Sequence, residues 1–149
     1  MENKADREVR IVTIVKAPVN LLWEAWTDPG HLVNWWGPTG FTSTIHIMDF
    51  REGGEWKLTL HGPDGTNFPN TSIFKEIVPL KKIVFEHFNP HFITAVLFEP
   101  EDEVTRLNWT LLFDTAEMRE IITRVHKADE GQQQNIERLE RYLSGLQRE

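Results

Sequence analysis

The sequence predicts an α+β fold in which a curved antiparallel sheet of seven strands wraps around a long C-terminal helix. Residues 42–114 are almost entirely strand-like and are interrupted by short turn segments. Connections of about two to five residues join antiparallel neighbours but never parallel ones. The chain after residue 114 has helical spacing instead. A helix laid in the concave side of a bent sheet leaves a space between them, where a ligand would bind.

One strand and two short helices are expected before this run of strands. Residues 8–16 alternate in a pattern typical of a strand with at least one buried face. Pro18 then favours a helix start. Apolar residues follow at helical spacing: Val19, Leu22, Trp23 and Trp26. Asp28 as a cap and Pro29 at the first position form a second start signal, and Gly37-Pro38 ends that helix after Trp36.

The central part of the chain is expected to form the rest of the sheet. Its strands are predicted at 42–50, 55–61, 70–78, 82–88, 91–99 and 104–113. The turns between them include Gly53-Gly54, Pro63-Asp64-Gly65 and Pro100-Glu101-Asp102. The strands at 55–61 and 104–113 alternate apolar with more polar residues, so each offers one face to an interior.

The C-terminal part is expected to form helices that pack on the sheet. Asp114 lies three residues before Glu117 and is the expected cap of the first helix. Asp129 stands in the same relation to Gln132 in a second helical segment. That segment carries an apolar stripe: Ile136, Leu139, Leu143 and Leu146. It is therefore an amphipathic helix that packs on an apolar surface.

Composition excludes several classes of function. The chain has 149 residues, which favours a single domain over residues 1–149, and it has no cysteine, which excludes disulfides, thiolate zinc sites and cysteine nucleophiles. Lys and Arg number 16 against 23 Asp and Glu, and the basic residues are scattered, which argues against nucleic acid as a partner. Without a signal-peptide pattern or an apolar run of about 20 residues, we expect a cytoplasmic protein that does not cross a membrane.

A resemblance to a known family rests on these stretches, in this order: APVNLLWEAWTDPGHLVNWWGPTGF, MDFREGGEWKLTLHGPDG, FPNTSIFKEIVPLKKIVFEHF and EGQQQNIERLERYL. They resemble the SRPBCC (START and birch-pollen-allergen-like) superfamily. Within it they are most similar to the bacterial branch named after the C-terminal domain of the activator of the heat-shock chaperone ATPase. The resemblance covers about residues 8–146, and the WWGP, GG and PDG motifs are specific for the branch.

The resemblance implies a helix-grip fold with a deep cavity. Members of the superfamily bind lipids, sterols, polyketides and other hydrophobic molecules, and some are cyclases or hydroxylase components. No shared catalytic motif comes with the resemblance, so it assigns no catalytic residue. It suggests that the WW-GP segment lies at the end of the cavity and that one face of each strand lines it.

The predicted binding residues take one face from each of several strands and from the last helix. They are Trp56, Leu58, Ile73, Phe85, His87, Leu107 and Trp109 from strands, and Ile136, Leu139 and Leu143 from the helix. Trp35 is added because Trp36 continues the stripe of Leu32. Phe74 is the competing choice for Ile73, since an error of one residue exchanges the faces of a strand. A core that is simply filled by these rings is the alternative to a cavity.

The polar candidates leave the chemistry open. No pair of histidines lies four apart on an expected helix; His87 and His91 have this spacing, but Asn89-Pro90 between them is a turn. We expect no metal and no cofactor. His87 shares a strand face with Ile83 and Phe85, either as a polar group of the pocket or as a structural histidine. Acid–base catalysis by a strand carboxylate such as Glu86 also stays open.

Three functions follow from these observations. The first is binding of a small hydrophobic molecule in the cavity between the sheet and the C-terminal helix. The second is an enzyme, similar to a cyclase or a hydrolase, that acts on such a molecule in the same cavity. The third is a module that contacts a chaperone or another protein, with a homodimer as a further option, through an exposed face.

Overall fold

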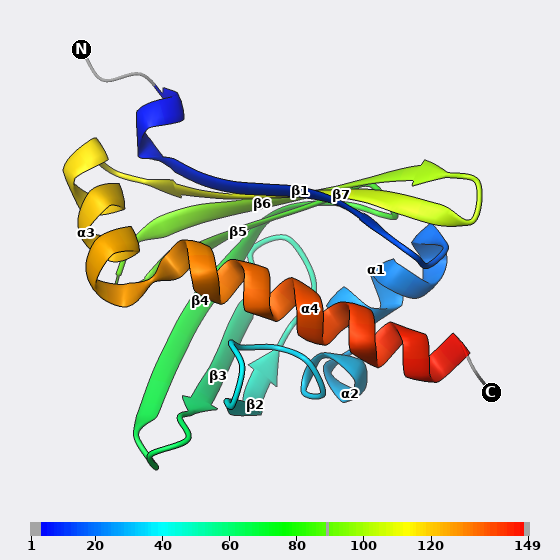
Figure 1. The fold of residues 1–149 in the computed structure, drawn as a ribbon, viewed down its shortest axis with the longest axis horizontal. Coiled ribbons are helices and arrows are strands. Elements are labelled where there is room, and N and C mark those ends of the chain that lie inside the picture. The colour runs from blue at the N-terminus through cyan, green and yellow to red at the C-terminus, as the bar shows by residue number, and fades with distance from the viewer. Residues whose placement is uncertain (1–3, 89, 148–149) are drawn as a thin grey trace.

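The computed structural model describes residues 4–88 and 90–147, apart from the side chain of His126 (Figure 1). A seven-stranded antiparallel sheet with the order β1-β7-β6-β5-β4-β3-β2 forms its framework, which confirms the predicted fold class. The strands are β1 (Glu8–Val15), β2 (Thr42–Met48), β3 (Glu55–His61), β4 (Asn67–Val78), β5 (Lys82–Phe88), β6 (Phe92–Glu101) and β7 (Val104–Phe113). From β2 to β7 each strand pairs with the next one in the chain, as the short turns predicted.

The sheet is strongly curved. β1, β7 and β6 run across the top of Figure 1, whereas β4, β3 and β2 turn towards the bottom. The strand register shifts between Ile45 and Ile47 in β2 and between Phe74 and Glu76 in β4. Such bulges bend a strand and increase its twist. They let the sheet turn around the helix that lies in its concave side.

Four α-helices accompany the sheet in the described residues: α1 (Val19–Thr27), α2 (Pro29–Leu32), α3 (Ala116–His126) and α4 (Ala128–Gln147). A short 3-10 helix, η1 (Lys4–Arg7), precedes β1. α4 lies across the concave side of the sheet, with α3 at one end and α1 and α2 near the other (Figure 1). This arrangement confirms the two short helices after the first strand and the long helix at the C-terminus.

The predicted helix starts are partly wrong. Asp28 does cap α2, since its Oδ1 accepts a hydrogen bond of 2.8 Å from the N–H of Gly30. Asp114 does not cap α3; Thr115 does, by accepting a bond of 3.0 Å from the N–H of Met118. Asp129 lies inside the first turn of α4, which begins at Ala128. Capping motifs locate a helix start to within one or two residues only.

Several other boundaries differ from the prediction. α2 is a single turn that ends at Leu32 and does not continue to Trp36. β4 begins at Asn67, because its pairing with β3 continues back to His61, next to the turn. β6 extends to Glu101 and pairs there with Val104, so that only Asp102 of the predicted turn Pro100-Glu101-Asp102 lies in the observed turn.

The core lies between the concave face of the sheet and the inner sides of α1, α2 and α4. Its largest fully buried side chains include Trp35, Phe74, Leu22, Leu107, Ile136, Leu139 and Leu143. Phe74 has 1% of its surface exposed, whereas Ile73 pairs with Glu55 and Glu86 on the opposite face of the sheet. The predicted inward orientation of Ile73 is therefore wrong, and the competing choice was right, because one residue exchanges the two faces.

Candidate functional site

A cavity of about 270 Å³ lies between the sheet and the first half of α4. This volume is slightly below the range of about 300–1,000 Å³ that is usual for small-molecule pockets. Its lining is mainly apolar and comprises Trp36, Gly37, Pro38, Leu60, Asn70, Phe85, His87, Phe92, Thr94, Trp109, Leu111, Phe113, Ile122, Lys127, Ala128, Gly131, Gln132 and Asn135. The site is thus built from β3 to β7, from α3 and α4, and from the segment after α2.

An outer cleft of about 540 Å³ lies beside this cavity. The two share four lining residues: Pro38, Leu60, Asn70 and His87. The outer cleft is completed by the rings of Phe41 and Phe68, whose centroids are 5.9 Å apart, and by Pro90. These four residues form the boundary between the cavity and the outer cleft, which we call the entrance.

Tryptophans form one end of the cavity. The ring of Trp36 stacks on that of Trp109 at 5.7 Å between centroids and lies 5.2 Å from that of Trp56. Trp35 points elsewhere: it is fully buried, and its indole N–H donates a hydrogen bond of 3.1 Å to the carbonyl of Ala25. The prediction that Trp35 rather than Trp36 borders the cavity is wrong. It assumed a helix through both residues, but α2 ends before them.

His87 lies where the cavity meets the outer cleft. Its ring stacks on Phe92 at 4.4 Å between centroids. Its Nδ1 lies 2.8 Å from the carbonyl oxygen of Pro90, and its Nε2 lies 2.6 Å from Oδ1 of Asn70. Both ring nitrogens are thus engaged by protein groups.

The protonation of His87 follows from these contacts. Burial lowers its pKa; the hydrogen bond to Pro90 opposes that shift, and His91 adds to it. A carbonyl oxygen only accepts, so Nδ1 carries a hydrogen. Nε2 faces another acceptor, Oδ1 of Asn70, because the Asn70 amide nitrogen donates a hydrogen bond of 2.9 Å to the carbonyl of Phe68. A hydrogen on Nε2 would satisfy this second acceptor, but the doubly protonated ring is the form that burial disfavours. His87 and Asn70 therefore form a coupled polar pair at the entrance.

A polar network fixes α4 to the segment after α2. The side-chain amide of Asn135 donates 2.8 Å to the carbonyl of Trp35, and its oxygen accepts from the N–H of Gly37 at 3.3 Å. The guanidinium of Arg138 donates to the carbonyls of Gly37 and Pro38 at 2.9 and 3.1 Å. These bonds hold the cavity wall at Trp36 against the helix.

The predicted binding residues fall into three groups. Phe85, His87 and Trp109 border the cavity. Trp35, Trp56, Leu58, Leu107, Ile136, Leu139 and Leu143 lie in the packed core and do not line it. Ile73 lies on the outer face of the sheet. The sequence left two alternatives, a cavity and a core filled by aromatic rings. The structure has features of both, since aromatic residues fill much of the concave side and leave a smaller cavity beside them.

Sequence reasoning missed several residues of the lining. Leu60 and Leu111 lie two positions beyond the predicted Leu58 and Trp109 on the same strand faces, so alternation was a sufficient signal for them. Lys127 and Gly131 border the cavity because of where α4 begins, and no periodic pattern marks that position.

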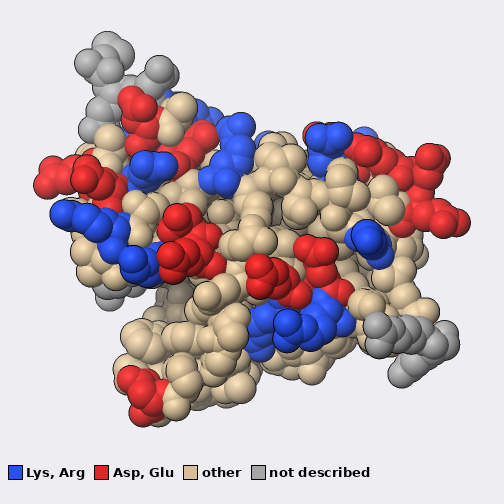
Figure 2. Space-filling model, viewed as in Figure 1, with Lys and Arg blue, Asp and Glu red and all other residues tan. Residues whose placement is uncertain are grey.

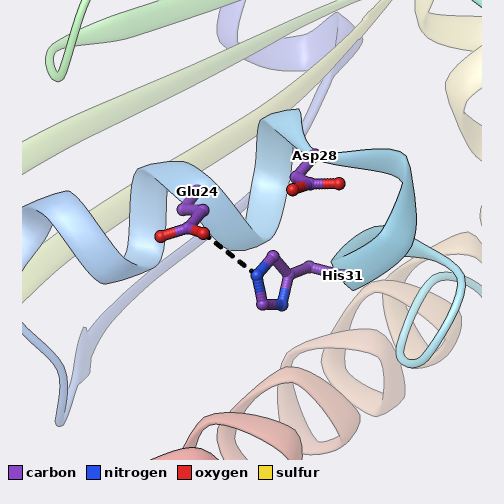
Figure 3. Close-up of side chains that lie close together, drawn as sticks. All are labelled: Glu24, Asp28 and His31. Carbon is purple, nitrogen blue, oxygen red and sulfur yellow. Dashed lines mark hydrogen bonds and ion pairs between the residues drawn. The ribbon is translucent and has the colours of Figure 1, made fainter.

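A second cluster of polar side chains lies outside the cavity (Figure 3). Glu24, Asp28 and His31 each place one potential ligand atom within 4.8 Å of the others. The groups already have protein partners: His31 contacts Glu24 at 3.2 Å and the hydroxyl of Tyr142 at 2.6 Å, and Asp28 caps α2. The cluster therefore ties α1 and α2 to α4.

The surface carries charges of both signs. Figure 2 shows Lys and Arg interspersed with Asp and Glu over one face, and not gathered in a single stripe. In the part of the chain that the structure describes, no helix is long and apolar enough to span a membrane.

Comparison with solved structures shows the same fold in other proteins. A protein from Nitrosomonas europaea has 23% identity and a TM-score of 0.89, over 99% of this chain and 100% of that one. A protein from Arthrobacter aurescens has 24% identity and a TM-score of 0.88, over 97% and 90%. An AHSA1-like protein from Aeromonas hydrophila has 18% identity and a TM-score of 0.72, over 95% and 96%. No match was found among curated proteins.

A family model identifies the chain more directly. The model described as "Activator of Hsp90 ATPase homolog 1-like protein" matches residues 16–144, from the end of the first strand to the last turns of α4. This agrees with the resemblance found in the sequence and with the fold of the solved structures. The chain belongs to the family of Activator of Hsp90 ATPase homolog 1-like proteins.

Proposed function

We propose that this protein binds a small hydrophobic molecule in the cavity between the sheet and α4. The observation that carries the proposal is a cavity of about 270 Å³ with a mainly apolar lining, which shares four lining residues with a larger outer cleft. A few polar groups among apolar walls are the usual composition of a small-molecule site. The volume suits a ligand of one or two rings.

The arrangement of polar groups favours binding over catalysis. Catalytic cavities bring together acids and bases with shifted pKa values. Here the ionisable residues of the lining are His87 and Lys127, and both nitrogens of the His87 ring are held by Pro90 and Asn70. An acid–base reaction would have to break one of these bonds first.

Gly131 offers a direct test of the proposed site. It lies in α4, borders the cavity, and a Cβ added to it would meet no atom within 4 Å. Gly131→Leu should therefore fill the cavity without backbone strain and with a gain in helix propensity of about 1 kcal/mol. We expect it to weaken binding of naphthalene-sized probes at least tenfold, as measured by quenching of tryptophan fluorescence.

Gly145→Leu is the matched control. Gly145 lies in the same helix with equal free space, but it is exposed and outside the cavity. This variant should bind the probes as the native chain does. If Gly131→Leu and Gly145→Leu bound the probes equally, the ligand would have to bind outside this cavity. A protein that acts only by contacting another protein would also be unaffected by Gly131→Leu.

A further inference from the structure

The charge of the cavity lining says more about the ligand than its apolar character does. Although the chain has 23 Asp and Glu residues, none of them lines the cavity or the outer cleft within the described ranges. The ionisable residues of the lining are His87, at the entrance, and Lys127, at the rim next to α4. The lining is therefore neutral to positive in an acidic protein.

Lys127 stands between the end of α3 and the start of α4. It has left-handed backbone angles, φ 56° and ψ 43°, which residues with a Cβ adopt at a cost in strain. Its charge lies at the favourable C-terminal end of α3, which it caps, and also directly before α4, where the helix dipole is positive. Its ammonium group makes no hydrogen bond or ion pair with the residues that the structure describes. The exposed ammonium group is therefore available to an anion at the rim of the cavity.

The N-terminus of α4 faces the cavity. Ala128 and Gly131 from its first turns belong to the lining. N–H groups of the first turn lack acceptors within the helix, and the lysine side chain before them has no oxygen with which to cap them. The acidic residues of this turn, Asp129 and Glu130, are exposed on another surface of the helix together with Gln133.

Within the described part of the chain, two buried donors of the lining have no partner. Thr94 is fully buried on the inner face of β6, between Phe85 on β5 and Leu111 on β7, and its hydroxyl has no hydrogen-bond partner. Trp109 has 5% of its surface exposed, and its indole N–H is likewise unpartnered. Buried donors without an acceptor are costly. Both residues border the cavity, so an acceptor atom on the ligand would relieve that cost.

We propose that the ligand is a small, mainly apolar carboxylic acid. This inference rests on the proposed function of the cavity. The apolar body lies among the rings of Trp36, Phe85 and Phe92, and the carboxylate faces Lys127 and the first turn of α4. Acceptor atoms of the ligand pair with the donors of Thr94 and Trp109. A carboxylate satisfies the unpaired cation and the helix dipole together.

Matched probes test this directly: 2-naphthoate and 2-naphthamide have nearly the same shape and differ in charge. Isothermal titration with the full chain should show the acid binding about tenfold more tightly than the amide, the size expected for one charge-assisted contact. Lys127→Asn removes the positive charge of the side chain, and asparagine tolerates the left-handed backbone angles at this position. In this variant the preference for the acid should disappear, because the acid loses far more affinity than the amide.

Two further variants complete the test. Lys127→Arg keeps the charge and should keep the preference for the acid. Lys81→Gln removes a charge from the turn between β4 and β5, outside the cavity, and should change neither affinity. Equal binding of the acid and the amide to the native chain would overturn the carboxylate proposal and leave the binding function intact. Binding of neither probe would overturn both.

Discussion

At the scale of single residues, two neighbouring histidines respond to pH in opposite directions. Burial lowers the pKa of His87. The hydrogen bond to Glu86 at 2.7 Å raises the pKa of His91, and a further bond of 2.9 Å to Asp114 adds to it. The stabilising effect of His91 is present below its unfolded pKa and is lost as pH rises through the folded one. The contribution of His87 is present above its unfolded pKa and is lost as pH falls.

His91→Gln separates the two contributions. In the native chain, the pairs of His91 with Glu86 and Asp114 make the free energy of unfolding fall as pH rises above about 6.5, the ordinary pKa of histidine, through the raised folded pKa. The variant should lose this fall and keep the decrease towards acidic pH that His87 causes. Urea unfolding across these pH values measures both slopes. A native slope that persists in the variant would show that His91 is not its source.

Two buried threonines give a second test at this scale. The hydroxyl of Thr94 has no partner, whereas that of Thr105 donates 2.9 Å to the carbonyl of Ala17, and both residues are fully buried. Replacing a threonine with valine changes the hydroxyl and little else. Thr94→Val should raise the free energy of unfolding of the unliganded protein by about 1 kcal/mol, and Thr105→Val should lower it by a similar amount.

The measurement for this pair is chemical unfolding, followed by titration with 6-hydroxy-2-naphthoate, whose second oxygen can accept from the hydroxyl of Thr94 while its carboxylate faces Lys127. Thr94→Val should bind this acid more weakly than the native chain while being more stable. A gain in stability without a loss of binding would mean that the hydroxyl of Thr94 does not contact the ligand.

At the scale of elements, the position of α4 depends on buried polar contacts as well as on its apolar stripe. Asn135 bridges the carbonyl of Trp35 and the N–H of Gly37, with 5% of its surface exposed. Asn135→Ala leaves both backbone groups unpaired and should cost about 2 kcal/mol of stability. Gln133→Ala, on the exposed side of the same helix, should stay within about 0.5 kcal/mol. Equal losses in a thermal or urea unfolding series would exclude this bridge as a determinant.

Element types were predictable from sequence, but their ends were less so. Period-two alternation and short turns identified every strand of the sheet, because both signals act over a few neighbouring residues. The caps at Asp114 and Asp129 were misplaced, because more than one residue near a helix start can accept the first N–H bonds. The end of α2 at Leu32 was missed because the apolar spacing of Leu32 and Trp36 continues past it. The orientations of Trp35 and Trp36 were therefore also predicted wrongly.

At the scale of the whole molecule, the cavity depends on how the curved sheet and α4 are set against each other. Sequence patterns show that both have an apolar side, but they do not show which side chains meet and which leave a gap. Phe85, His87 and Trp109 could be predicted as cavity residues from alternation along their strands. Lys127 could not be predicted, because it borders the cavity only where α3 ends and α4 begins, and no periodic pattern marks that position.

Native mass spectrometry of the full chain purified from cells tests the central claim, that this cavity holds a small molecule, most directly. We expect the native chain to carry one small molecule per chain, identifiable after extraction as an apolar acid, and Gly131→Leu to lose it. A mass of the bare chain for the native protein, together with no probe binding, would contradict the claim. The same molecule bound equally to Gly131→Leu would contradict its location.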